Sequence, residues 1–136
     1  MKKILTFGVY DYFHLGHLRL FKQCRKYGDY LIVAVQDGDF ILQFKPDANV
    51  LYSTAERIEM VESINIVDKV IVYETVDISI LGTIDFDVLA LGEDHTGKRF
   101  DKVEKWCRTH GKEVVRLKRT QGISSTKIKS QIKKMV

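Results

Sequence analysis

Short apolar runs without polar–apolar alternation recur along the chain, each bounded by turn-forming residues. The runs are Ile4–Phe7, Tyr30–Val35, Val70–Tyr73, Val88–Leu91 and Val114–Leu117. Runs of this length that are rich in β-branched residues and lack alternation are typical of strands buried on both faces. The pattern therefore predicts a parallel sheet of five strands.

Amphipathic stretches of helix length separate these runs. The predicted helices are Leu15–Tyr27, Ser53 or Thr54 to Asn65, Phe100–His110 and Ser124–Met135. Ser53 and Glu56 have the spacing of a capping box. The only proline, Pro46, falls within Phe44–Val50 and predicts an irregular loop there. Alternation of strand and helix predicts an α/β fold, a three-layer Rossmann-like domain with right-handed crossovers.

Length and composition fit one globular domain spanning residues 1–136. The chain is 45% hydrophobic and 29% charged, which excludes a disordered protein. No apolar run approaches the ~20 residues of a membrane span, and the N-terminus lacks a signal-peptide pattern. Cys24 and Cys107 are the only cysteines, fewer than a secreted disulfide scaffold normally carries. We therefore expect a cytoplasmic protein with free thiols and no membrane partner.

The net charge of +4 is unevenly distributed. Residues 111–136 hold eight basic side chains against Glu113 alone, a charge of +7, which leaves −3 on the preceding 110 residues. A basic end on a mildly acidic body indicates a local anion site or a basic tail. Because aromatic residues are not interleaved with these basic ones, we expect no nucleic-acid partner.

Ligands of open α/β sheets bind outside the carboxyl ends of the strands, here the loops after Phe7, Val35, Leu91 and Leu117. The first of these loops contains His14 and His17, which share one side of a first helical turn. Gly16 between them lets a ligand approach the backbone. The free N–H groups of the helix start favour a phosphate, and two imidazoles could stabilise charge during phosphoryl transfer.

Two other interpretations of these histidines stay open at this stage. They could form a partial metal site with Asp11, although two histidines and one carboxylate leave the ligand set short. They could also be helix-capping residues without a ligand.

The basic end contains a second candidate anion site. Ser124 suits a helix N-cap, and its hydroxyl, the hydroxyls of Ser125 and Thr126, and the free N–H groups would form an anion cradle. Arg119 adds a forked charge. We expect Ile128 and Ile132 on an inward face of this helix, and Lys129, Lys133 and Lys134 on a solvated face.

The two segments together resemble a known family. H-x-G-H after a first strand, preceded by G-x-x-D, resembles the signature of the nucleotidyltransferase superfamily that includes cytidylyltransferases. The segment Arg119–Thr126 closely resembles the more specific cytidylyltransferase signature R-T-x-G-I-S-S/T-S/T. The resemblance extends over essentially all 136 residues and is strongest to the bacterial glycerol-3-phosphate cytidylyltransferases.

The resemblance implies roles for individual residues. The catalytic residues would be His14, His17, Lys45 and Arg119. The nucleotide-binding residues would be Gly8, Val9, Tyr10, Asp11, Gly16, Asp94, Thr120, Ile123, Ser124 and Ser125. The acceptor-binding residues would be Arg57, Asn65 and His95. No residue is expected to hold a resident metal, and Mg²⁺ would arrive with the nucleotide.

Two positions depart from the family pattern, both on the acceptor side. Asn65 stands where the family has an arginine associated with catalysis and acceptor binding. His95 stands where the family loop after the fourth strand carries an aromatic residue. These departures leave the acceptor less defined than the nucleotide.

The resemblance implies a cytidylyltransferase that joins CMP from CTP to a phosphorylated small molecule and releases pyrophosphate. The acceptor would be glycerol 3-phosphate or a related phosphorylated polyol, amino alcohol or amide, and the products typically feed cell-surface polysaccharide or lipid synthesis. The family is often dimeric, so we expect a homodimer. Two alternatives remain: an adenylyltransferase acting on a sugar phosphate or flavin, and a non-enzymatic nucleotide-binding module.

Overall fold

A computed structural model describes residues 1–119 and 123–135 of the chain. Its sheet contains β1 (Lys3–Gly8), β2 (Tyr30–Gln36), β3 (Lys69–Tyr73), β4 (Val88–Gly92) and β5 (Glu113–Leu117). The strands are parallel and lie in the order β3-β2-β1-β4-β5. The predicted five-stranded parallel sheet is confirmed.

Six helices accompany these strands in the described part of the chain: α1 (Leu15–Cys24), α2 (Gly38–Phe44), α3 (Thr54–Glu62), α4 (Ile78–Leu81), α5 (Lys98–Thr109) and α6 (Ser125–Met135). The capping box of Ser53 and Glu56 at the start of α3 is confirmed, with both reciprocal hydrogen bonds present. The sequence did not predict α2 and α4. Each begins at an aspartate N-cap, Asp37 and Asp77 respectively, but is too short to give a clear helical period.

Alternate residues of each central strand enter two separate hydrophobic cores. On one face, Leu5 and Leu89 pack with Leu81 of α4 and with Val103 of α5. On the other face, the strand residues pack against α1 and α3; this second core is made of Ile4, Leu31, Val33, Val88 and Ala90 with Phe21, Cys24 and Val61. Burial on both faces explains why the strand segments show no polar alternation.

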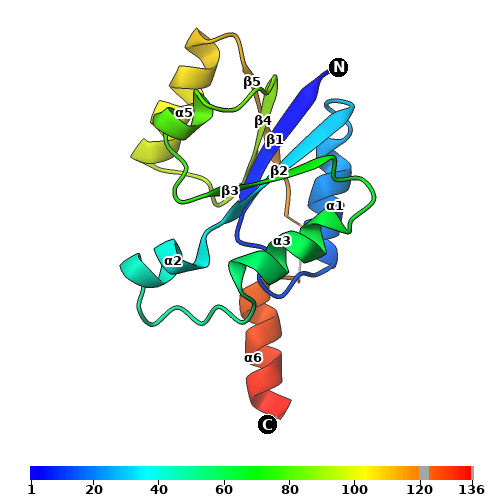
Figure 1. Cartoon of the computed structure of the whole chain (residues 1–136), viewed down its shortest axis with the longest axis vertical. Helices are drawn as coiled ribbons and strands as arrows, with labels where there is room; N and C mark the ends of the chain where they lie inside the picture. The colour runs from blue at the N-terminus through cyan, green and yellow to red at the C-terminus, as the bar shows by residue number, and fades with distance from the viewer. Residues whose placement is uncertain (120–122, 136) are drawn as a thin grey trace.

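The chain winds away from β1 in two directions. The first crossovers lead to β2 and β3, and the later ones to β4 and β5, so the order reverses between β1 and β4. Such a reversal opens a crevice at the carboxyl ends of the two strands. Figure 1 shows that α6 starts below this edge and projects from the body.

The exposed position of α6 corrects one expectation. None of its described residues is buried, and Ile132, predicted to face inward, is 44% exposed. Within the described residues, no helix combines the length and the apolar character that a membrane span requires.

Candidate active site

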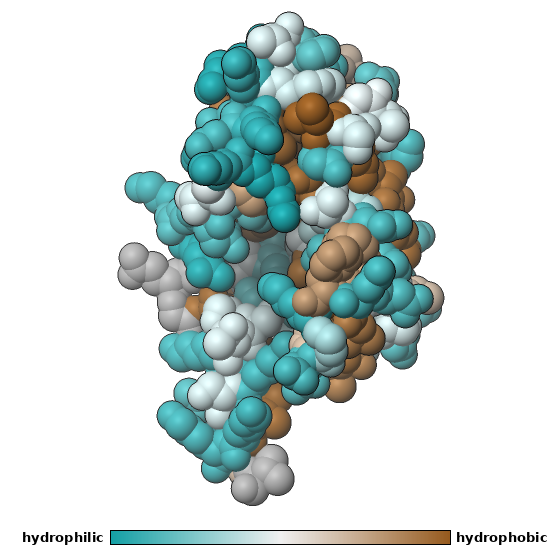
Figure 2. All heavy atoms as spheres, turned by 90° about the vertical axis from the view of Figure 1, so that its left-hand side faces the viewer, coloured by the Kyte–Doolittle hydropathy of each residue, from teal (hydrophilic) through white to brown (hydrophobic). Residues whose placement is uncertain are grey.

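A cavity of about 630 Å³ lies at the carboxyl ends of β1, β4 and β5. Its lining comes from both ends of the chain, and the space-filling view in Figure 2 shows a recess on this side of the molecule. The structure brings most of the candidate residues to this cavity: Gly8, Val9, Tyr10, Asp11, His14, Gly16, His17, Lys45, Asp94, His95, Arg119, Ile123, Ser124 and Ser125. Thr120 lies outside the described residues.

The two histidines are held by the helix start that they cap. His14 is the N-cap of α1, and its Nδ1 accepts a hydrogen bond from Gly16 N at 3.0 Å. The Nδ1 of His17 accepts from His14 N at 3.2 Å. The two rings stack with centroids 3.9 Å apart. Capping and cavity lining are therefore combined in the same side chains.

These hydrogen bonds determine which ring nitrogen carries the proton. A neutral imidazole that accepts at Nδ1 must be protonated at Nε2, so each ring retains one N–H donor at Nε2. Burial lowers the pKa of His17 to about 3, and the proximity of His14 contributes to this shift. Burial and the charge of Arg119 lower the pKa of His14. Near neutral pH the pair therefore offers two uncharged donors.

Asp11 and Arg57 support the loops around the cavity. The Asp11 carboxylate accepts hydrogen bonds from Leu51 N at 2.8 Å and Tyr52 N at 3.0 Å. Both of its oxygens therefore hold the backbone of the loop that precedes α3. Arg57 is fully buried, and its guanidinium donates to the carbonyls of Val9, Gln36 and Tyr52. Arg57 does not line the cavity but supports the loops around it, and the acceptor contact expected of it stays a prediction.

The start of α6 is joined directly to the loop after β1. Ser124 Oγ accepts from Lys127 N at 3.0 Å, as expected of an N-cap. Ser125 Oγ donates to the carbonyl of Asp11 at 2.8 Å. The contact spans most of the chain and places the cap beside His14.

Lys129 was predicted to lie on a solvated helix face, and this prediction is wrong. Lys129 lines the cavity, donates from Nζ to the carbonyl of Asn49 at 2.8 Å and lies 5.1 Å from the ring centroid of Tyr12. No pattern in the sequence distinguishes Lys129, because the other lysines of the helix are equally basic. Lys118 and Thr126 also line the cavity.

Asn65 lies at the opposite edge of the sheet. It is exposed in the connection between α3 and β3, next to Asp68, whose N–H donates to the carbonyl of Leu31 near the start of β2. Because parallel strands all begin at the edge away from their carboxyl ends, Asn65 does not reach the cavity within one chain. The expected acceptor contact of Asn65 is therefore absent from the described part of this site.

The loop after β4 contributes Asp94 and His95. The Nδ1 of His95 accepts from Gly92 N at 3.1 Å, and its ring stacks on Phe100 with centroids 4.8 Å apart. Burial lowers the pKa of His95. Within the described residues no group of three or more potential metal-binding side chains is found.

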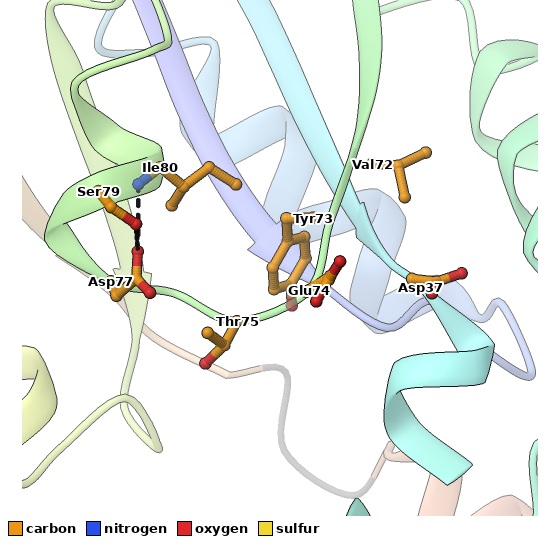
Figure 3. A pocket seen from close by; sticks show the side chains of 8 residues that line it. All are labelled: Asp37, Val72, Tyr73, Glu74, Thr75, Asp77, Ser79 and Ile80. Atoms are coloured by element: carbon orange, nitrogen blue, oxygen red, sulfur yellow. Dashed lines mark hydrogen bonds between the residues drawn. The ribbon is translucent and has the colours of Figure 1, made fainter. Parts of the chain in front are cut away.

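A second, more open cavity of about 510 Å³ lies beyond the ends of β2 and β3. Figure 3 shows Asp37 on one side and Asp77 and Ser79 on the other, with Tyr73, Glu74 and Thr75 between them. The ring of Tyr73 contacts that of Phe7, which lines the first cavity, with centroids 4.9 Å apart. The two cavities therefore each have one ring of this aromatic pair in their lining.

Comparisons with known proteins identify the family of this chain. A family model described as Cytidylyltransferase-like matches residues 5–131. The glycerol-3-phosphate cytidylyltransferase of Bacillus subtilis (strain 168) is 40% identical over 134 residues, which are 97% of this chain and 98% of that protein. The enzyme of the same name from Staphylococcus aureus (strain NCTC 8325 / PS 47) is 39% identical over 137 residues, covering 97% and 96%.

A solved structure supports the fold. The crystal structure of the lipopolysaccharide core biosynthesis protein from Thermoplasma volcanium GSS1 superimposes with a TM-score of 0.75 and 22% identity. The match covers 89% of this chain and 99% of that one, and at this identity it extends to the fold alone.

Replacing Gly16 by alanine tests the packing of the histidine cap. A Cβ at Gly16 would lie 2.7 Å from Cε1 and 2.9 Å from Nδ1 of His14, so the imidazole must leave its capping position. We expect the free energy of unfolding to fall by about 1–3 kcal/mol, the usual cost of overpacking. Urea denaturation measures it, with Arg19→Ala on the exposed side of α1 as the control. Equal stability of Gly16→Ala and the wild type would contradict the capping geometry.

The lowered pKa of His17 predicts a pH dependence of stability. Between pH 6.5 and 3 the unfolded chain binds a proton at this position that the folded chain does not. The contribution of His17 to the free energy of unfolding is therefore fully present above pH 6.5. It is lost as the pH decreases, by at most about 1.4 kcal/mol per pH unit for one group. Urea denaturation at pH 7, 6 and 5 should show a shallower decrease for His17→Asn. Parallel profiles for variant and wild type would refute the prediction.

Proposed function

Because this chain belongs to the cytidylyltransferase-like family, we propose that it transfers CMP from CTP to glycerol 3-phosphate and releases pyrophosphate. The observation that carries the proposal is the meeting of the two histidines with the α6 start and Arg119 in one cavity. The relatives named above, at 39 and 40% identity over nearly the whole chain, support both the nucleotide and the acceptor.

The reaction requires positioning and charge stabilisation more than a strong base. An oxygen of the acceptor phosphate attacks the α-phosphorus of CTP in line, the bond to the β-phosphate oxygen breaks, and pyrophosphate leaves. A phosphate monoester dianion is already a competent nucleophile, so no covalent enzyme intermediate is needed. Preorganised donors that contact the phosphates then lower the barrier.

The residues around the cavity suit these tasks. His14 and His17 would donate from Nε2 to the α- and β-phosphates without adding charge. Arg119, Lys45 and the helix start at Ser124 and Ser125 would neutralise the departing pyrophosphate.

Mg²⁺ would enter with the nucleotide and supply charge neutralisation at the phosphates. Magnesium is commonly held by one or two carboxylates together with substrate phosphates. Asp94 fits this requirement, because it is an exposed carboxylate in the cavity lining. The Asp11 carboxylate is occupied by two backbone N–H groups and is therefore less suited.

The second cavity offers partners for the non-phosphate part of the acceptor. Its hydroxyls and carboxylates, including Thr75, Glu74 and Asp77, can bond to the hydroxyls of a polyol. The chemistry of a CDP-linked polyol further suggests a cytoplasmic enzyme that feeds cell-surface polysaccharide synthesis.

Comparing nucleotide donors tests the proposed function. We expect pyrophosphate release with CTP and glycerol 3-phosphate, and a rate at least about a hundredfold lower for His14→Ala, the scale seen when one preorganised donor is removed. Arg19→Ala, also on α1, is the matched control and should retain wild-type turnover.

Other outcomes of this experiment identify the alternatives. A clear preference for ATP would establish the adenylyltransferase interpretation and refute ours. Nucleotide binding without turnover on any phosphorylated polyol, amino alcohol or amide would favour a binding module.

We further propose a homodimer formed through α2 and the edge strand β3. No residue of α2 is buried, and Leu42, Phe44 and Val72 are 44%, 66% and 48% exposed. Large apolar side chains exposed on a helix and on a sheet edge are features of association surfaces. Sedimentation should give twice the monomer mass, and Val72→Lys should shift it toward the monomer, whereas Val9→Lys at the cavity should not. A monomeric wild type would refute this arrangement.

A further inference from the structure

Arg116 connects β5, the loop after β4 and α5 beside the cavity. It lies on β5, paired in register with Leu91 of β4. Its Nη1 donates to the carbonyl of Gly92 at 3.1 Å and also to the carbonyl of His95. Its Nη2 pairs with the carboxylate of Glu104 on α5.

The loop that Arg116 holds is the one that carries Asp94 and His95 into the cavity. This loop closes on itself, because His95 N donates to the carbonyl of Gly92 while Gly92 N donates to the His95 ring. Arg116 binds the two carbonyls at the ends of the same turn. It does not itself line the cavity, so its effect on a ligand must pass through the loop.

A guanidinium is suited to this role and an ammonium is not. The planar fork of arginine presents several N–H donors in fixed directions, so it can bind two carbonyls and one carboxylate together. Lysine has a single point charge on a flexible stem. Glu104 in turn fixes the guanidinium, and its own side chain is only 22% exposed.

We propose that Arg116 is a positioning residue that fixes the loop Gly92–His95, and with it the Nε2–H tautomer of His95, whose side chain lines the cavity. The His95 ring then presents an uncharged donor, oriented by Gly92 N and by the stacking on Phe100. The kinetic consequence rests on the proposed function, whereas the structural consequence does not.

The first test uses the free protein and needs no turnover. The imidazole nitrogen chemical shifts of His95 distinguish the two neutral tautomers. In the wild type we expect a protonated Nε2 and an unprotonated Nδ1. In Arg116→Met the shifts should move toward the average of the two tautomers, and Glu104→Gln should move them partway. Arg108→Met is the matched control, since Arg108 also lies beside Glu104, at 3.7 Å, but is 68% exposed and contacts no loop carbonyl.

The second test measures kinetics. Arg116→Met should lower kcat/KM for the acceptor by about ten- to a hundredfold, the effect of a small misplacement of site groups. Arg116→Lys should recover little of this loss, and Arg108→Met should stay within about twofold of the wild type. If Arg116 acts through His95, the losses in Arg116→Met and His95→Asn should be less than additive in the double variant.

The two arms separate the failure of each proposal. An inactive wild type refutes the proposed function but leaves the chemical-shift test intact. Unchanged His95 shifts in a folded Arg116→Met, with the thermal midpoint used to verify folding, would overturn the positioning role. A uniform loss of activity that is fully additive with His95→Asn would also overturn it.

Discussion

In a parallel sheet every strand is covered on both faces and every strand ends at the same edge, so polar chemistry can gather only beyond that edge. The strand order of this chain reverses between β1 and β4, so the connections that follow these two strands lead in opposite directions. The loop after β1, the loop after β4 and the segment after β5 all open into the resulting crevice. Residues more than a hundred positions apart become neighbours there, as Ser125 and Asp11 do.

The histidine pair shows how a local backbone requirement shapes the chemistry. A helix start has free N–H groups that need acceptors. Here Gly16 N and His14 N use the Nδ1 atoms of the two imidazoles, so each ring is left with a donor at Nε2. Burial and the stacked arrangement disfavour two positive charges side by side, which keeps the donors neutral near physiological pH. Neutral donors can strengthen their hydrogen bonds as charge develops on a phosphate.

The sequence predicted features that depend on neighbours along the chain. All five strands, the α3 capping box and the cavity position of His14 and Ser124 follow from local pattern and from the rule for strand ends. It failed where a long-range contact decides. Arg57 donates to three carbonyls from separate segments, and Lys129 donates to the carbonyl of Asn49. The hydrophobic periodicity of the sequence does not predict such contacts. Asn65 was assigned from its position in a motif, but the topology places it at the far edge of the sheet. The sequence did not predict α2, because its seven residues have no buried face and so show no amphipathic pattern.

Asp11 joins the segments on which the proposed nucleotide site depends. Its carboxylate binds the N–H groups of Leu51 and Tyr52, and its carbonyl receives the hydroxyl of Ser125 at the start of α6. The helix α6 has little packing of its own, since none of its described residues is buried. Its docking therefore rests on a few polar contacts, among them Ser125 to Asp11 and Lys129 to Asn49.

A ligand that bridges the α1 and α6 helix starts would add to these contacts and stabilise the docked helix by mass action. Part of the +7 charge of the last 26 residues lies on α6, and an anion at the cavity gains from this part only while the helix is docked. Binding of the proposed nucleotide would therefore favour the docked position of the basic end.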